Sequence, residues 1–210
     1  MSEKTCPACG APAVIRNPAT ISKVCEYCST VMVWDQDSLK NAGKESRLAE
    51  GYSRLYRWAT GTIQGTRFQV IGRVRYSFGR GFWDEWYVML ESGEGHWITE
   101  DNHAFSFQEL SVSSANLPQF EDAKVGDNLK INQRDYQIQE KGMATCLGIE
   151  GELPRGILPN EQYPYVDGSS YDGEYTFGLE YDNDDQQPTL FVGKWVKPSQ
   201  LKLDDESLDW

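Results

Sequence analysis

The sequence predicts a mainly β protein that begins with a small cysteine-rich unit, continues through a short connecting helix and ends in an antiparallel β body. Two observations predict this order. The cysteines form two closely spaced pairs near the N-terminus, and short apolar runs separated by glycine-containing turns follow from residue 61 onward. Of the 210 residues, 39% are apolar and 25% charged, which excludes collagen-like, coiled-coil and fully disordered chains.

The chain is strongly acidic, with a net charge of −12 at pH 7. The excess lies after residue 140, where 14 acidic residues accompany five basic ones. This balance disfavours general binding to phosphate backbones. Residues 51–80 differ, because they hold six arginines and no acid, which would pair either with acids of the same fold or with an anionic partner. No apolar run approaches the ~20 residues that cross a bilayer, and we expect a cytoplasmic protein.

The cysteine pattern is the strongest motif. Cys6 and Cys9 form one Cys-x-x-Cys pair, and Cys25 and Cys28 form a second pair fifteen residues later. This spacing is typical of a tetrahedral zinc site, whereas disulfides or a redox pair are the less favoured alternatives in a cytosolic chain. Four thiolates leave no position for water or substrate, so we expect one structural Zn²⁺. The fifth cysteine, Cys146, is expected to be a small buried apolar residue.

The zinc ribbon is expected to span residues 1–38. A unit of this size cannot build an adequate core, so the metal would supply much of its stability. Its strand candidates are Val14–Ile15 and Thr30–Trp34. Zinc ribbons bind nucleic acid, bind proteins or cap a domain. Three basic residues are too few for a convincing nucleic-acid surface: Lys4, Arg16 and Lys23.

Residues 39–60 are expected to form a helical connector. Apolar residues recur at helical spacing and form one stripe that predicts a helix over Ser46–Trp58: Leu48, Tyr52, Leu55, Tyr56 and Ala59. Gly61 lies just after the expected helix end. This helix would pack between ribbon and body.

The remainder reads as short strands, including 66–76, 82–90, 95–99, 176–181 and 189–196. Their small size predicts an antiparallel barrel of the SH3 type. The segments 67–71 and 135–139 share an aromatic-Gln-aliphatic step, which indicates a duplicated plan. We therefore expect two barrel-like halves over 61–118 and 119–203, followed by an acidic tail over 204–210.

Four short motifs in this order resemble the bacterial domain-of-unknown-function family 4178 over about residues 60–203: FQVIGR at 68–73, WDEWY at 83–87, WITE at 97–100 and EGELP at 150–154. The resemblance implies a cytosolic β-rich domain, sometimes with a zinc ribbon in front. It also implies an operon setting with polyamine-synthesis-like enzymes and small multi-span membrane proteins, and hence a membrane-linked or stress-related complex. It implies no established reaction, so it assigns no catalytic residue.

Candidate binding residues come from these motifs: Arg73, Trp83, Glu85, Trp86, Trp97 and Glu152. Side chains alternate along a strand, so Trp83 and Glu85 share one face while Asp84 and Trp86 share the other. One of the two acids is expected inside, paired with an arginine of residues 73–80. The alternative is a groove in which tryptophans supply stacking surface and Glu85 or Arg73 supplies recognition.

No nucleophile, phosphate-loop or kinase motif is present, and we expect no enzyme activity. The leading hypothesis is a zinc-containing adaptor whose Trp-rich face binds a protein partner. The alternative is a site for a small cationic, polyamine-like ligand, either in a binding domain or in an accessory subunit of a polyamine-type enzyme, using carboxylates and cation–π contacts. Contact of the ribbon with nucleic acid is the weakest alternative.

Overall fold

The structure is a computed structural model that describes residues 4–35, 38–49, 51, 53–112, 116–181 and 187–205. The described residues form strands throughout, with one short 3₁₀ helix. Of the predicted acidic tail, residues 206–210 lie outside the described residues. Asp204 is held on the body, because both of its oxygens accept hydrogen bonds from Arg67 at 2.9 Å. No helix in the described residues has the length and apolar character needed to span a membrane.

The N-terminal unit and the first half of the body contain eight strands: β1 (Ser22–Val24), β2 (Thr30–Asp35), β3 (Ser38–Glu45), β4 (Thr60–Ile63), β5 (Thr66–Ser77), β6 (Phe82–Leu90), β7 (Gly95–Asp101) and β8 (Ala104–Ser111). The second half contains β9 (Asn128–Ile131), β10 (Arg134–Leu153), β11 (Gln162–Ser170), β12 (Tyr175–Glu180), β13 (Thr189–Val196), the 3₁₀ helix η1 (Pro198–Gln200) and β14 (Leu201–Leu203). The strands predicted for the body are confirmed to within two residues at each end. Residues Val14–Ile15 form no strand.

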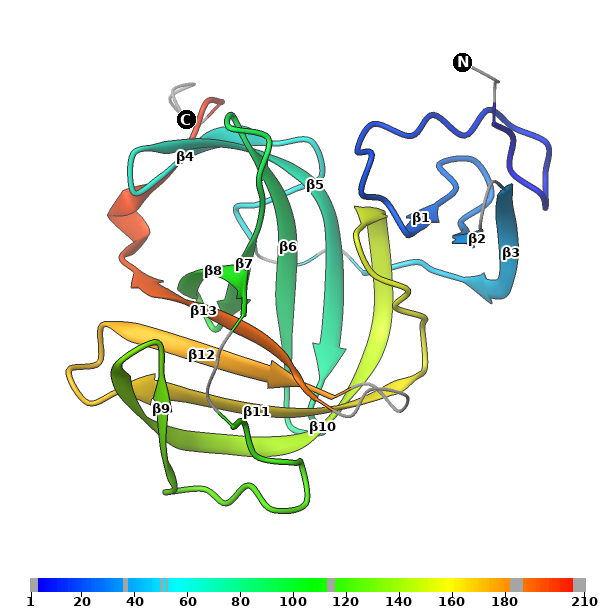
Figure 1. The fold of residues 1–210 in the computed structure, drawn as a ribbon. Helices are drawn as coiled ribbons and strands as arrows, with labels where there is room; N and C mark the ends of the chain where they lie inside the picture. Colours follow the sequence, from blue (N-terminus) through cyan, green and yellow to red (C-terminus); the bar gives the residue numbers. More distant parts are fainter. Residues whose placement is uncertain are drawn as a thin grey trace.

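Eight of these strands close into a ring, which Figure 1 shows beside the N-terminal unit. The antiparallel order is β5-β6-β7-β8-β13-β12-β11-β10, and β10 pairs back with β5. The two predicted halves are therefore not separate bodies, because each contributes four strands to one ring. The backbones of β5 and β10 approach so closely that a Cβ at Gly72 or Gly151 would lie 2.2 Å from a carbonyl oxygen of the other strand.

The predicted duplication corresponds to two similar hairpins. The hairpins β4–β5 and β9–β10 each join a four-residue strand to a long one through two residues with positive φ, Gln64–Gly65 and Asn132–Gln133. Positive φ at both central residues is the turn geometry that matches the twist of paired strands. The shared aromatic-Gln-aliphatic step lies at the start of the long strand in both hairpins.

Apolar side chains form separate cores on the two faces of the ring. The inner face carries a core that includes Val74, Tyr87, Trp97 and Phe191. On the outer face, one core lies under β4 and β14 and includes Trp86, and another lies near β9 and includes Phe177. This division follows from strand alternation, which sends neighbouring residues to opposite faces.

The predicted helix over Ser46–Trp58 is wrong, because the described residues of that segment run in an irregular path across the outer face of the ring. Tertiary bonds take the place of helical ones. The carbonyl of Ala49 accepts a hydrogen bond from Arg75, and Ser46 bonds to both backbone groups of Ile149 at 2.6 Å. Two residues of the predicted apolar stripe, Leu55 and Ala59, are nevertheless buried in the outer core.

Candidate functional site

The four predicted ligand cysteines come together in the N-terminal unit. Their sulfur atoms all lie within 4.8 Å of one another. The Sγ atoms of Cys6 and Cys28 are 3.8 Å apart, as are those of Cys9 and Cys25, and none of the four forms a disulfide. Hydrogen bonds with the side chain and backbone of Thr30 lower the pKa of Cys28 to about 6, whereas hydrogen bonds with the other three thiols and burial raise the pKa of Cys9 to about 12.

This geometry fits a tetrahedral metal ion. Sulfurs at about 2.3 Å from a tetrahedral centre are about 3.8 Å apart, which is the separation of both cross-pairs. Each Cys-x-x-Cys pair lies in a tight turn, and the two turns face each other. The four cysteines could therefore hold a metal ion in a closed shell.

Glu152 connects this unit to the ring. It is the penultimate residue of β10, which leaves the ring and pairs with β1. Its fully buried carboxylate accepts hydrogen bonds from the N–H groups of Arg16 and Asn17, the hydroxyl of Thr20 and the ammonium of Lys23, all at 2.9–3.1 Å. All these donors lie between the two cysteine pairs. Glu152 therefore fastens the cysteine unit to the body.

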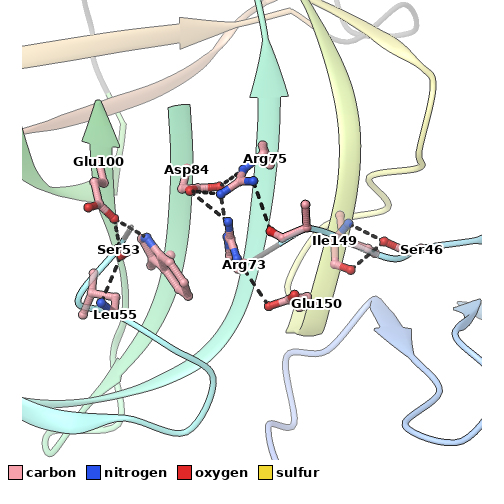
Figure 2. A network of polar contacts seen from close by, with 11 residues as sticks. Ser46, Ser53, Leu55, Arg73, Arg75, Asp84, Glu100, Ile149 and Glu150 are labelled. Atoms are coloured by element: carbon pink, nitrogen blue, oxygen red, sulfur yellow. Dashed lines mark hydrogen bonds and ion pairs between the residues drawn. The ribbon is translucent and has the colours of Figure 1, made fainter. Parts of the chain in front are cut away.

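A second buried acid organises the outer face, as Figure 2 shows. Asp84 on β6 accepts two hydrogen bonds from Arg73 and two from Arg75, at 2.8–3.0 Å. Glu150 lies 3.7 Å from Arg73 and adds a second negative charge. Beside this group, the indole of Trp86 donates to Glu100 at 3.2 Å. As predicted, one of the two acids is buried and paired with arginines of residues 73–80, and Ala49 of the segment that crosses the outer face accepts a hydrogen bond from Arg75.

The other face of the same strands lines a cavity of about 190 Å³ inside the ring. Trp83 is its central aromatic residue, with ring centroids 5.2–5.7 Å from those of Tyr76, Phe78 and Tyr165. Tyr163 packs edge-on against Tyr76. Further aromatic lining comes from Trp97, Phe191 and Trp195. The cavity is thus walled by π surfaces contributed by strands from both halves of the ring.

Five carboxylates also line this cavity: Glu85, Asp101, Glu140, Asp167 and Glu180. Burial raises the pKa of Asp167 to about 8, with further contributions from the charges of Glu85 and Glu140. Burial likewise raises the pKa of Glu85, although a hydrogen bond from the Trp83 indole at 2.9 Å opposes it. The pKa of Asp101 is raised by burial and by Glu140. Burial and mutual repulsion therefore disfavour the ionised forms of several acids in this cavity.

Arg155 is the cation that reaches this cluster. It forms an ion pair with Glu180, and its charge lowers the pKa of Glu85. Five acidic side chains line the lumen, and Arg155 pairs with one of them without lining the cavity itself. The arrangement can hold a positively charged group by carboxylate pairing and by cation–π attraction.

The structure places the predicted candidate binding residues in three different locations. Trp83, Glu85 and Trp97 line the cavity, as the shared-face prediction for Trp83 and Glu85 required. Arg73 and Trp86 lie on the outer face, and Glu152 lies against the cysteine unit. Cys146 is fully buried, as predicted.

The sequence analysis missed the second half of the site. Asp167, Tyr163 and Tyr165 belong to β11, and Glu140 to β10, strands whose pairing with the first half no local pattern revealed. Two features of the sequence could have indicated these residues: the stretch rich in Tyr, Asp and Gly after residue 163, and the excess of acidic residues in the last third of the chain.

Comparison with known proteins identifies a family for most of the chain. Residues 59–198 match the family described as Domain of unknown function (DUF4178). Neither the curated proteins nor the solved structures include a significant match. The matched region runs from just before β4 through β13 and so contains all eight strands of the ring, whereas the cysteine unit precedes it. Because the match spans two thirds of the 210 residues, the chain belongs to the DUF4178 family.

Proposed function

We propose that the protein binds a small organic cation in the lumen of its strand ring. The observation that carries the proposal is the cavity lined by five carboxyl groups and a set of aromatic rings, in which Arg155 forms an ion pair with one of the acids, Glu180. Aromatic faces attract cations, and carboxylates in a partly dehydrated site need a counter-charge. A ligand cation satisfies both requirements.

Closed rings of eight antiparallel strands support such a site. In eight-stranded barrels the interior is wide enough to be filled by side chains or to hold one small ligand. The cavity of about 190 Å³ is smaller than the ~300–1,000 Å³ pockets of drug-sized ligands. The ligand is therefore a small cation, or the charged end of a longer one.

We further propose that the four cysteines hold one structural zinc ion. Two Cys-x-x-Cys turns are a common zinc-binding arrangement, and a four-sulfur shell excludes substrate. The ion would stabilise the segment that donates four groups to Glu152. In this proposal the ribbon supports the ring and takes no part in ligand chemistry.

The adaptor hypothesis requires an exposed face rich in tryptophan, and the positions of the tryptophans do not favour it. Trp86 and Trp97 are only 1% and 6% exposed, and Trp83 points into the lumen. The cationic-ligand alternative therefore takes precedence over the adaptor, and the same residues serve it from inside the ring.

Isothermal titration calorimetry tests the proposal. The full-length, metal-loaded protein is titrated at low salt with butylammonium, tetramethylammonium and, as an anionic control, acetate. We expect one cation site per chain and no acetate binding. Glu85→Gln should weaken the cation at least tenfold, whereas Glu91→Gln, the same change in an exposed turn, should leave affinity unchanged. Absence of binding by both cations would overturn the proposal.

A further inference from the structure

The carboxylate of Asp167 accepts no hydrogen bond from another described residue. The neighbouring strand leaves room for it, because a Cβ at Gly178 would lie 3.1 Å from Oδ1 of Asp167. A partly buried carboxylate without a donor is costly when it is ionised.

Glu85 faces the same part of the lumen and is only partly compensated. Its carboxylate accepts one hydrogen bond, from the indole of Trp83, and the charges of Glu85 and Asp167 act on one another. Two acids that interact in a low-dielectric space resist simultaneous ionisation. The pair therefore favours holding a proton when no cation is present.

Arg155 lowers the pKa of Glu85, but it is ion-paired with Glu180, and the other titratable groups around the pair bring no positive charge. Tyr76, Tyr163 and Tyr165 have raised pKa values and stay neutral at pH 7. Cys146, near Tyr76, also has a raised pKa and stays a thiol. Nearby, Glu161 adds negative charge.

The remaining lining groups are acids or neutral. Glu140 already accepts the hydroxyl of Tyr165 at 2.7 Å, Asp101 lies near it, and Glu180 is paired with Arg155. In the described part of the chain, β8 and β13 line the cavity with groups that do not titrate: Ser106, Gln108, Phe191 and Trp195.

We infer that the lumen takes a primary ammonium group between Glu85 and Asp167, and that this ammonium replaces a proton held by the two carboxyls. The inference rests on the proposed function and names its ligand class. A primary ammonium carries three N–H donors, so it can satisfy the donor-free carboxylate of Asp167 as well as neutralise it. A quaternary ammonium has no N–H and would leave that carboxylate without a hydrogen bond.

The exchange balances in charge and atoms. The ligand enters with one positive charge, one carboxyl O–H bond breaks, and the proton leaves to solvent. The net charge of the site is then the same before and after binding. Affinity for the amine must therefore rise with pH while the exchanged proton is still bound in the free protein.

Calorimetry with two cations of five non-hydrogen atoms tests the inference. Butylammonium and tetramethylammonium are titrated at pH 6.5 in phosphate and in MOPS, whose different ionisation enthalpies report the protons released. We expect butylammonium to bind at least tenfold more tightly, to release close to one proton and to gain up to tenfold in affinity from pH 5.5 to pH 6.5. Asp167→Asn should abolish the proton release and most of the preference, and Glu91→Gln should change neither.

The outcomes separate the inference from the proposed function. Equal affinity for the two cations, or butylammonium binding without proton release, overturns the inference and leaves cation binding intact. Failure of both cations to bind the wild-type protein overturns the proposed function and the inference together. Thermal unfolding of each variant verifies that it is folded before it is titrated.

Discussion

The ammonium of Lys23 donates to the carboxylate of Glu152 at 3.0 Å, and both side chains are almost completely buried. Lys23 lies in β1 of the cysteine unit, whereas Glu152 lies in the strand that continues from the ring. This ion pair and the backbone donors around it reinforce the β1–β10 strand pairing that attaches the two parts.

Glu152→Gln is expected to loosen the cysteine unit. The amide cannot neutralise buried Lys23 and turns an acceptor into a donor, which costs about 3–5 kcal/mol when a buried pair is broken. Urea unfolding measures the loss, and limited proteolysis should show cleavage near residues 16–23. Glu26→Gln breaks only the exposed pair with Arg16 and should cost about 1 kcal/mol or less. Equal effects of the two substitutions would contradict this role for Glu152.

Removal of the metal is expected to disorder the cysteine unit before the ring. Metal binding and folding are coupled in such small units, so a chelator should raise amide exchange in residues 4–35. The strands β6 and β12 should keep their protection because they belong to the ring. Native mass spectrometry should find one zinc per chain, lost in Cys25→Ser and retained in Cys146→Ser. A metal-free protein with an unchanged exchange pattern would refute the structural role of zinc.

Asp84→Asn should be among the most destabilising single changes in the body. It leaves the buried guanidinium groups of Arg73 and Arg75 without their shared counter-charge, at a cost of about 3–5 kcal/mol. The matched control is Asp204→Asn, which removes the partner of exposed Arg67 and should cost about 1 kcal/mol or less. Chemical denaturation compares the two, and a small effect of Asp84→Asn would show that the arginines find other partners.

The stability of the protein should depend on the ionisation of Asp167. Its pKa is raised to about 8 in the folded protein, so between pH 4 and pH 8 the folded state binds more protons than the unfolded state. This contribution to stability is present below the unfolded pKa and is lost as pH rises toward 8. Asp167→Asn stays neutral and should flatten the decline, making the variant more stable than wild type at pH 8. An unchanged pH profile in this variant would contradict the raised pKa.

Local patterns predicted the strands well and the cavity in part. Alternation in the WDEW motif separates Trp83 and Glu85 from Asp84 and Trp86, which is the division found between lumen and outer face. The four cysteines were predictable because metal geometry fixes their spacing. These successes depend on short-range rules that hold within one strand or one turn.

Long-range pairing was not predictable in the same way. The ring closes through β5 with β10 and β8 with β13, which joins segments whose contact no periodicity encodes. For the same reason no local pattern points to Asp167 and Glu140, and the candidate binding residue Glu152 lies instead where the ring meets the cysteine unit. The helical spacing over 46–58 is misleading because the backbone groups of this segment form tertiary hydrogen bonds instead, the Ala49 carbonyl with Arg75 and the Ser46 N–H with the Ser29 carbonyl.

A crystal structure of the zinc-loaded protein with saturating butylammonium tests the central claim most directly. The account predicts density for the amine inside the ring, with its nitrogen within hydrogen-bond distance of the carboxylates of Glu85 and Asp167 and its alkyl chain along the ring of Trp83. A lumen that contains only ordered water under these conditions, or an amine bound elsewhere on the chain, would contradict it.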